Sequence, residues 1–235
     1  MGKLIEIRLH ACSPASIQCA TLVAGKKMKR LTLILLSILA LAACDSKPAT
    51  NTASPEKPKQ ETKANEYETG RGAFQKLYIA AHGWAVDAKP FRLQSEYNAG
   101  DPVTEGKAGV WHCAFGSAAR SSMKSFQWTG ISGPGLEQGV SHGGDDAYSA
   151  TNTSTQVFDV AFLKIDSDAA FQVAQKHGGE KLTKADPKIP VFFTLEWNHG
   201  KNKLEWRVSY GSSSDDSQLR VVVDATEGSF LRVEK

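Results

Sequence analysis

The folded part of this chain carries the same residue pattern twice, and this repetition constrains its fold more than any other feature. Three segments recur in the same order at offsets of 97, 100 and 95 residues: 73–75 with 170–172, 90–98 with 190–198, and 111–117 with 206–212. Chance similarity between strands explains one such match, but not three in register. The sequence therefore predicts two tandem repeats, over residues 67–130 and 157–235.

Each repeat reads as a helix followed by antiparallel strands. In the first, apolar residues fall at the i, i+3, i+4, i+7 spacing of one helix face: Phe74, Leu77, Tyr78 and Ala81. In the second, Ser167 or Asp168 is expected to cap a short helix that Gly178-Gly179 closes. We expect Val157–Ile165 to add a strand before this helix.

The strands alternate between apolar and polar residues. After Pro190, one face carries Val191, Phe193, Leu195 and Trp197. The predicted fold class is therefore α+β, with two tandem repeats that each pack a helix on a small antiparallel sheet. Between the repeats, residues 131–156 are rich in Gly and Ser, and six glycines within 130–144 predict a loop. At this length it is either a flexible linker or a functional loop.

An export signal precedes the repeats. Lys29 and Arg30 follow Met28, and the uncharged run Leu31–Ala43 ends at Cys44, as in a secretory signal peptide. The run is shorter than the roughly 20 residues that span a bilayer. The sequence Leu41-Ala42-Ala43-Cys44 resembles the lipobox of bacterial lipoproteins. This resemblance implies cleavage between Ala43 and Cys44 and lipidation of Cys44, with palmitate as an expected acyl group. The alternative is an ordinary secretion signal with an incidental cysteine.

The segments around this signal have separate interpretations. Residues 28–43 are the predicted signal peptide, and residues 1–27 are too long for its charged start, so we expect translation to begin at Met28. Residues 44–66 comprise the lipidated cysteine and a linker. From Asp45 to Glu66 there is no Leu, Ile, Val, Met or aromatic residue, which predicts a disordered tether.

Removal of the leader changes the charge of the chain. The full sequence has 28 basic and 25 acidic residues. Residues 1–43 hold six of the basic residues and one of the acidic residues, so the processed chain has a net charge of −2. No basic stripe remains for nucleic-acid binding, which depends largely on phosphate neutralisation. Only Cys44 and Cys113 remain as cysteines. Cys113 alternates with Trp111 and Phe115, which predicts a buried, inert thiol.

The second repeat resembles the PepSY family of peptidase propeptides and bacterial envelope proteins. The resemblance rests on the helix ending in Gly-Gly, the strand 206–210 and the tail Val221–Leu231, which contains Val-Asp-Ala-x-x-Gly. It implies a cystatin-like helix-on-sheet module with a peptidase-inhibiting or regulatory role. The first repeat lacks this tail and ends Ser125–Gly130, so its membership follows only from the repetition. A generic α+β module unrelated to the family is the alternative.

No catalytic motif emerges from the sequence. The chain lacks His-Glu-x-x-His, Cys-x-x-Cys and a phosphate-binding loop, and Pro134 breaks the resemblance of Gly130–Gly133 to a nucleophile elbow. His142, Asp145 and Asp146 bring one imidazole and two carboxylates together, but a solvated loop explains them better than a metal site. We therefore expect no enzyme activity, no catalytic residue, no metal and no cofactor.

Paired aromatic residues are the remaining candidates for binding. Tyr97, Trp111, Trp197 and Trp206 recur between the repeats, and the sequence leaves open whether they form core or line a groove. We expect a membrane lipoprotein of the cell envelope, facing the periplasm or the outside, that acts as a non-catalytic protein-binding module and possesses an envelope-protein partner. The alternative is binding of a small ligand in an aromatic groove between the repeats.

Overall fold

The structure is a computed structural model that describes residues 63–97, 105–153, 155–213 and 215–234. All of them belong to one compact unit within Lys57–Lys235. The predicted start at Met28, the signal peptide, Cys44 and the linker up to residue 62 lie outside the described residues. The folded part begins before the predicted boundary at residue 67, because the Glu66 amide donates to the Gly130 carbonyl at 2.8 Å.

The described residues of this unit form ten strands and five helical segments. The strands are β1 (Glu68–Thr69), β2 (Lys89–Glu96), β3 (Lys107–Ala108), β4 (Val110–Ser117), β5 (Ser122–Thr129), β6 (Gly139–Ala147), β7 (Val191–Asn198), β8 (Lys203–Gly211), β9 (Ser217–Asp224) and β10 (Phe230–Glu234). The helical segments are α1 (Gly70–Trp84), the 3-10 turn η1 (Val160–Phe162), α2 (Ser167–Ala174), the π-type turn η2 (Gln175–Gly179) and α3 (Glu180–Ala185).

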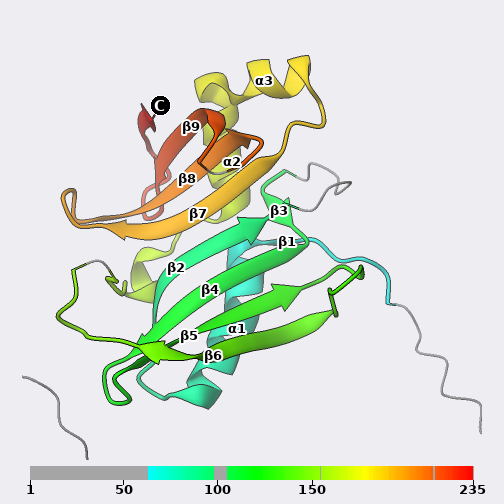
Figure 1. The fold of residues 1–235 in the computed structure, drawn as a ribbon. Helices are drawn as coiled ribbons and strands as arrows, with labels where there is room; N and C mark the ends of the chain where they lie inside the picture. The colour runs from blue at the N-terminus through cyan, green and yellow to red at the C-terminus, as the bar shows by residue number, and fades with distance from the viewer. Residues whose placement is uncertain (1–62, 98–104, 154, 214, 235) are drawn as a thin grey trace, which may run out of the picture. The chain divides into compact units, whose positions relative to one another are not determined.

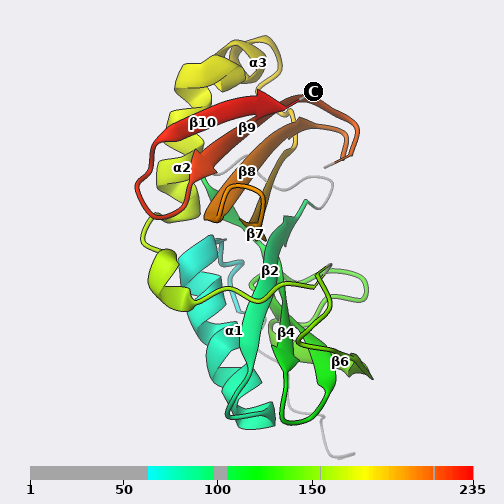
Figure 2. The same cartoon turned by 90° about the vertical axis from the view of Figure 1, so that its left-hand side faces the viewer.

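Eight of the strands form one continuous antiparallel sheet in the order β10-β9-β8-β7-β2-β4-β5-β6. The expectation of a separate small sheet for each repeat is therefore wrong, because β2 and β7 pair and join the two halves. The helices lie on one side of this sheet, with α1 behind β4 and β5 and α2 behind β8 and β9 (Figures 1 and 2). We call the opposite side of the sheet the open face.

The pairing of β2 with β7 follows the offset between the matched segments. An offset of 100 residues equates Gln94 with Thr194, and these two residues are opposite one another in the ladder. The adjacent pairs are Leu93 with Leu195 and Arg92 with Glu196. Strands β2 and β7 therefore pair antiparallel where the two halves meet. This pairing relates the halves by an approximate two-fold rotation.

Helix α1 forms as its apolar spacing predicts. Thr69 caps its N-terminus, where the side chain accepts from the Gly72 amide at 3.3 Å. The buried stripe is Gly70, Ala73, Phe74, Leu77 and Ala81. The helix extends one residue beyond Gly83, to Trp84. Burial of this stripe against β4 and β5 is what stabilises a helix of this length.

Helix α2 differs from the prediction at both ends. Its cap is Asp166, one residue earlier than expected, and the carboxylate accepts from the Ser167 amide at 2.6 Å. The helical segment does not end at Gly178-Gly179, as predicted, but kinks there and continues into α3. Gly178 takes a φ of +115°, which only glycine adopts without strain, and this value produces the kink.

Residues at the N-terminus of α2 also cap the N-terminus of α1. The Gly70 amide donates to Ser167 Oγ at 2.7 Å, and that hydroxyl donates to the Gly106 carbonyl at 2.5 Å. The Arg71 amide donates to the Asp166 carboxylate at 2.8 Å. The positive ends of two helix dipoles therefore meet at hydrogen-bond acceptors that the second half supplies.

Two further predictions about elements are corrected. The segment 131–156, predicted as a loop, contains the nine-residue strand β6, which pairs with β5. All nine residues of β6 are exposed, so the strand carries no alternation that a sequence pattern could reveal. The segment Val157–Ile165, predicted as a strand, instead contains the turn η1, whose cap is Asp159. The Phe158 amide bonds to the Pro90 carbonyl at 2.8 Å and ties this segment to the start of β2.

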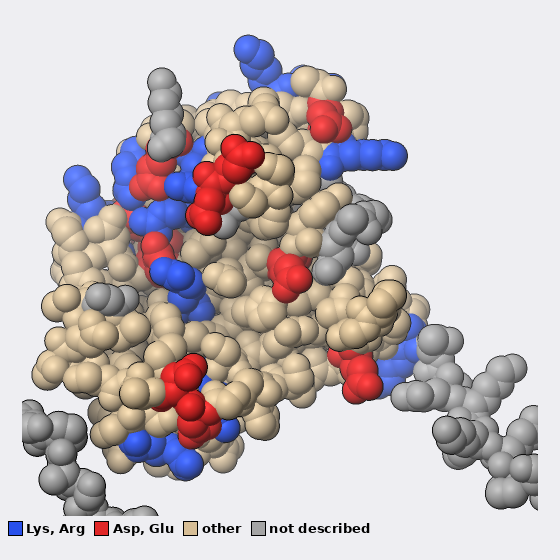
Figure 3. Space-filling model, in the orientation of Figure 1, with Lys and Arg blue, Asp and Glu red and all other residues tan. Residues whose placement is uncertain are grey.

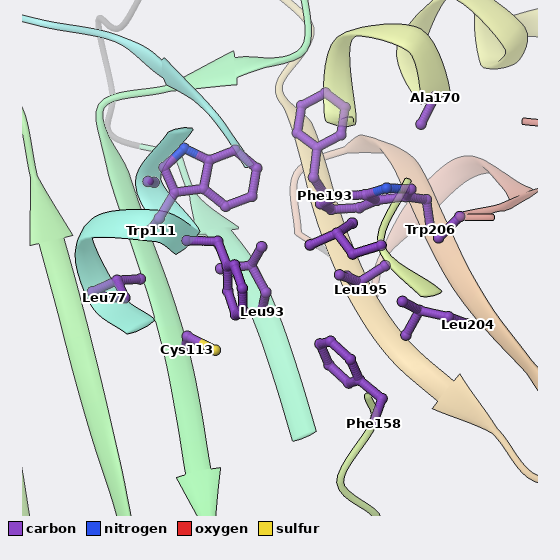
Figure 4. Packing of buried hydrophobic residues seen from close by; sticks show 14 of the residues in the cluster. Leu77, Leu93, Trp111, Cys113, Phe158, Ala170, Phe193, Leu195, Leu204 and Trp206 are labelled. Carbon is purple, nitrogen blue, oxygen red and sulfur yellow. The ribbon is translucent and has the colours of Figure 1, made fainter. Parts of the chain in front are cut away.

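A single hydrophobic core fills the space between the sheet and the helices (Figure 4). Equivalent contacts occur in both halves. Trp111 Nε1 donates to the Glu68 carbonyl at 3.0 Å, and Trp206 Nε1 donates to the Ile165 carbonyl at 2.9 Å. Both carbonyls immediately precede a helix cap, so each indole fixes the start of its helix. Phe74 packs on Phe115 as Phe171 packs on Tyr210.

Candidate functional site

Trp111 and Trp206, two of the predicted binding residues, are core residues. Both side chains are fully buried, and their rings meet in an edge-to-face contact with centroids 6.4 Å apart. Phe193 packs against Trp111 in the same cluster. Figure 4 shows these rings filling the space between the halves on the helix side. The aromatic groove expected there is absent from the described residues, because the rings that were to line it are packed against each other.

Tyr97 and Trp197 are half-buried, and Trp197 packs against the hydrophobic core. The ring of Tyr97 contacts Phe192 with centroids 6.2 Å apart, and the ring of Trp197 contacts Phe162 at 5.1 Å. Phe162 is 43% exposed. Trp197 and Phe162 form a small aromatic surface, whereas no ring contact joins Trp197 to Tyr97 in the described structure.

The polar residues His142, Asp145 and Asp146 lie in β6 and do not converge. Asp145 bonds to Lys124 Nζ at 2.7 Å and to Trp84 Nε1 at 3.2 Å, and the Lys124 bond holds the pKa of this carboxyl below its usual value. His142 instead packs its ring near Phe126. Among the described residues, no three His, Cys, Asp or Glu side chains are arranged to hold a metal ion. These contacts attach the edge strand to the end of α1.

The open face carries the most developed polar arrangement of the described structure. Outward positions on β2, β7, β8, β9 and β10 bring together seven alternating charged side chains, which we call the arginine–glutamate ladder: Arg92, Glu196, Arg207, Glu205, Arg232, Glu234 and Arg220. Figure 3 shows the open face, with basic and acidic side chains gathered over the half formed by β7 to β10. The ladder spans both halves because β2 pairs with β7.

Glu205 is the most buried member of the ladder. Its side chain is fully buried, and both of its oxygens accept hydrogen bonds from Arg232, each at 2.8 Å. Asn198 donates a further bond at 3.0 Å. Burial by itself opposes ionisation of Glu205, but the hydrogen bonds from Arg232 and Asn198 hold the pKa of the carboxyl below its usual value. Glu205 is therefore a fixed negative charge.

Glu196 links the buried part of the ladder to its exposed end. One oxygen of Glu196 pairs with Arg207, and the other accepts from Nε and Nη2 of Arg92 at 3.0 and 2.9 Å. The Arg92 side chain is 50% exposed. Its Nη1 atom has no hydrogen-bond partner among the described residues. The ladder therefore begins at a half-exposed guanidinium group with an unused donor.

A depression of about 320 Å³ opens over this end of the ladder. We call it the open-face depression, and it is lined by Arg92, Gln94, Thr194, Glu196, Arg207, Ser209, Asp215 and Arg220. Arg220 Nε donates to Ser209 Oγ at 3.1 Å, which fixes the guanidinium group at the wall. The depression is lined by the paired residues Gln94 and Thr194, so it lies on the approximate two-fold axis that relates the halves.

Two adjoining hollows of about 480 Å³ each form a second cavity, the helix groove, beside α2 and α3. Its lining includes Glu105, Gln172 and Lys176, and at one wall Thr183 Oγ1 bonds to Gln175, which bonds to Tyr210 Oη. Burial raises the pKa of the Tyr210 hydroxyl, so it stays protonated. The lining combines these amide and hydroxyl groups with the charged side chains of Glu105, Lys107, Asp168, Lys176 and Glu180.

Sequence reasoning missed the ladder and the depression. The signal that could have found them is the alternation on β8, where Glu205, Arg207 and Ser209 fall between the core residues. This alternation puts those three side chains on one outward face. Their partners come from β2, β9 and β10, so only the strand order reveals that the charges meet.

Comparisons with known proteins leave the family of this chain open. No protein-family model and no curated protein matches the sequence. A solved structure described as a "putative lipoprotein" from Clostridium difficile 630 is similar at 12% identity with a TM-score of 0.45, over 69% of this chain and 91% of that chain. No helix among the described residues is long and apolar enough to cross a membrane. The resemblance to the PepSY family therefore stays a prediction.

Proposed function

We propose that this protein is a lipid-anchored component of the bacterial cell envelope whose folded unit is a non-catalytic polypeptide-binding module. The signal Met28–Ala43 directs export, Cys44 carries the lipid and the following polar residues act as a tether. About 22 residues of flexible chain have a root-mean-square reach of roughly 25–30 Å. Two acyl chains or more make such an anchor effectively permanent.

We further propose that the module consists of two PepSY-like repeats fused into one sheet. The equivalent indole hydrogen bonds of Trp111 and Trp206 support duplication. The pairing of Gln94 with Thr194, its equivalent at the 100-residue offset, supports it independently. A role in regulating a peptidase rests on the family resemblance alone and is the narrower form of this proposal.

The single observation that carries the binding function is the open face itself. All described helices lie on the other side of the sheet (Figure 2), so this face has no covering layer among the described residues. Half of it bears charges held in fixed positions by the arginine–glutamate ladder. Fixed, partly desolvated charges select a partner by complementarity rather than by apolar burial alone.

Small-ligand binding is the second candidate, and the helix groove is the observation that favours it. Its volume is in the range of small-molecule pockets, although its lining is more polar than theirs. Because the predicted aromatic groove is filled by core rings, this alternative now depends on Gln172, Gln175 and their neighbours rather than on Trp111 or Trp206.

Site-specific photo-crosslinking in the living cell tests the binding module. A photoreactive amino acid is placed at Gln94 and at Ser125, which are exposed on the open face, and at Gln75 and Lys184 as matched positions on helices. We expect a discrete protein adduct from the two open-face positions and none from the helix positions. Adducts from the helix positions only, or from no position, would contradict the proposal.

Metabolic labelling tests the anchor. Labelled palmitate should enter the wild-type protein and a Cys113→Ala variant, but not a Cys44→Ala variant, because Cys44 is the predicted lipidation site. Incorporation that survives Cys44→Ala would reject lipidation at this cysteine.

A further inference from the structure

We propose that the open-face depression binds a carboxylate of an acidic polypeptide segment, with Arg92 and Arg220 as its direct ligands. This inference rests on the proposed function for the identity of the partner, but the binding chemistry follows from the ladder. Guanidinium groups suit carboxylates because their planar donors match the two oxygens.

The charge balance of the depression leaves room for one more negative group. Its lining contains three arginines, Arg92, Arg207 and Arg220, and two carboxylates, Glu196 and Asp215, which leaves one positive charge in excess. The carboxylates of Glu205 and Glu234 are used mainly by Arg232 and Arg207, with Arg232 Nη2 bonded to Glu234 at 2.5 Å. The excess therefore belongs to the end that faces the depression.

Arg92 is the group best placed to receive an anion. Glu196 neutralises Arg92 and Arg207 together, so one carboxylate serves two guanidinium groups. Arg207 additionally contacts Glu205 at 3.4 Å and Glu234 at 3.3 Å and is only 18% exposed. Arg92 has no second acidic partner among the described residues, is half-exposed and keeps Nη1 unused.

The opposite wall supplies further donors. Arg220 is fixed at this wall, where its Nε donates to Ser209 Oγ at 3.1 Å and its Nη1 lies 4.0 Å from Glu234. Thr194 also lines the depression and offers a hydroxyl group. A carboxylate in this space would meet donors from β2, β7 and β9 at once.

The first half of the sheet lacks this arrangement, which makes the depression a single site. The offset of 95 residues equates Arg207 with His112 and Glu205 with Val110. His112 pairs with Glu96 at 2.7 Å, and no arginine extends that pair among the described residues of β4 and β5. The approximate two-fold rotation therefore relates the linked charges of the second half to a first half in which Glu96 and His112 form a separate pair.

Asp215 supplies an internal test of the charge argument. It lines the depression, and no ion pair holds it within 4 Å of a described basic group. Its negative charge opposes an incoming anion, so Asp215→Asn should strengthen carboxylate binding, whereas Arg92→Gln should weaken it.

The experiment follows the arginine Nε–Hε signals by NMR in the mature lipid-anchored chain in detergent micelles, at constant ionic strength. The probe is a blocked pentapeptide, Gly-Gly-Glu-Gly-Gly, and its control replaces Glu by Gln. We expect saturable shifts of the Arg92 and Arg220 signals, with a Kd on the order of millimolar for about two charge-assisted bonds. Arg92→Gln should weaken binding about fivefold or more. Asp215→Asn should strengthen it about two- to fivefold.

Lys184→Gln, on the exposed α3, is the matched control and should leave the affinity unchanged. Shifts that stay linear with concentration, equal affinity for the Gln peptide, equal loss in Lys184→Gln, or tighter binding of inorganic phosphate would each overturn the inference. Carboxylate binding without an open-face adduct in cells would uphold the depression and reject the proposed polypeptide partner. An open-face adduct in cells without carboxylate binding would uphold the polypeptide partner and reject carboxylate binding in the depression.

Discussion

At the scale of single residues, the arginine–glutamate ladder depends on Glu205, a carboxylate with no exposed side-chain surface. It stays charged because Arg232 and Asn198 replace the water that burial removes. Its outward position could be predicted from the alternation with Leu204 and Trp206. Its burial could not, because the groups bonded to it come from β10 and from the end of β7.

Replacement of this carboxylate should destabilise the fold. Glu205→Gln removes the charge from two bonds to Arg232 and should lower the free energy of unfolding at pH 7 by about 2 kcal/mol, the range of hydrogen bonds to charged groups. Urea titration measures this change. Glu227→Gln, at a 67% exposed side chain, is the control and should change stability little. A Glu205→Gln variant as stable as wild type would show that the ladder does not hold the sheet.

The same carboxylate predicts a dependence on pH. The folded-state pKa of Glu205 lies below the usual value of 4.5 for a glutamate, so the unfolded chain binds the proton first as the pH falls. Stability from this group is complete well above pH 4.5 and is lost as the pH drops through and below that value. The free energy of unfolding, measured by urea titration, should fall less between pH 7 and pH 3.5 in Glu205→Gln than in wild type. Equal losses would assign the acid sensitivity to other carboxyls, such as Asp224.

Cys113 is a position at which the predicted burial and the structure agree. It is fully buried, and desolvation raises the pKa of its thiol. In the processed protein, a thiol reagent at pH 8 should therefore modify Cys113 only in denaturant, as a colorimetric thiol assay would show. Rapid reaction in the native protein would contradict the burial.

At the scale of elements, both helices were predictable because each buries an apolar stripe, whereas their ends depended on contacts from elsewhere. The cap at Asp166 also accepts from the Arg71 amide of the other helix, and this double use explains why Asp166 rather than the expected Ser167 or Asp168 is the cap. Strand β6 was missed because an exposed edge strand has no buried face to leave a period-2 pattern.

The kink between α2 and α3 gives a matched pair of glycine substitutions. At Gly179 a Cβ atom would lie 2.4 Å from Tyr210 Oη, so Gly179→Ala should destabilise the protein by about 1–3 kcal/mol through overpacking. At Gly83, near the end of α1, nothing lies within 4 Å, and Gly83→Ala should stabilise it by about 0.5–1 kcal/mol. Thermal unfolding followed by circular dichroism compares the two. A stabilising Gly179→Ala would mean that the close approach to Tyr210 is relaxed in solution.

At the scale of the whole molecule, the two halves form one cooperative unit. They share the β2–β7 pairing, the contact between Trp111 and Trp206, and the hydrogen bonds from the N-terminus of α1 to Ser167 and Asp166. A further bond runs from the Phe193 amide to Ser95 Oγ at 2.9 Å. Because each half completes the hydrogen bonds of the other, we expect neither to unfold alone.

Ser167 tests this coupling. Its buried hydroxyl joins Gly70 to Gly106, so Ser167→Ala should cost about 1–3 kcal/mol by leaving buried backbone groups unpaired. Native-state hydrogen exchange should show equal loss of protection in β5 of the first half and β9 of the second. Loss confined to β9 would indicate that the halves unfold independently.

The sequence by itself determined the features that short-range patterns encode: two helices with apolar stripes, strands that alternate between core and surface, the buried Cys113 and the matched segments of the two halves. Only the tertiary structure decided how these parts combine. A hydrogen-bonded ladder between β2 and β7 joins residues about 100 positions apart, and backbone groups carry no residue-specific signal for such pairing. The ladder of charges follows from that pairing, because Arg92 meets Glu196 only when the two halves share one sheet.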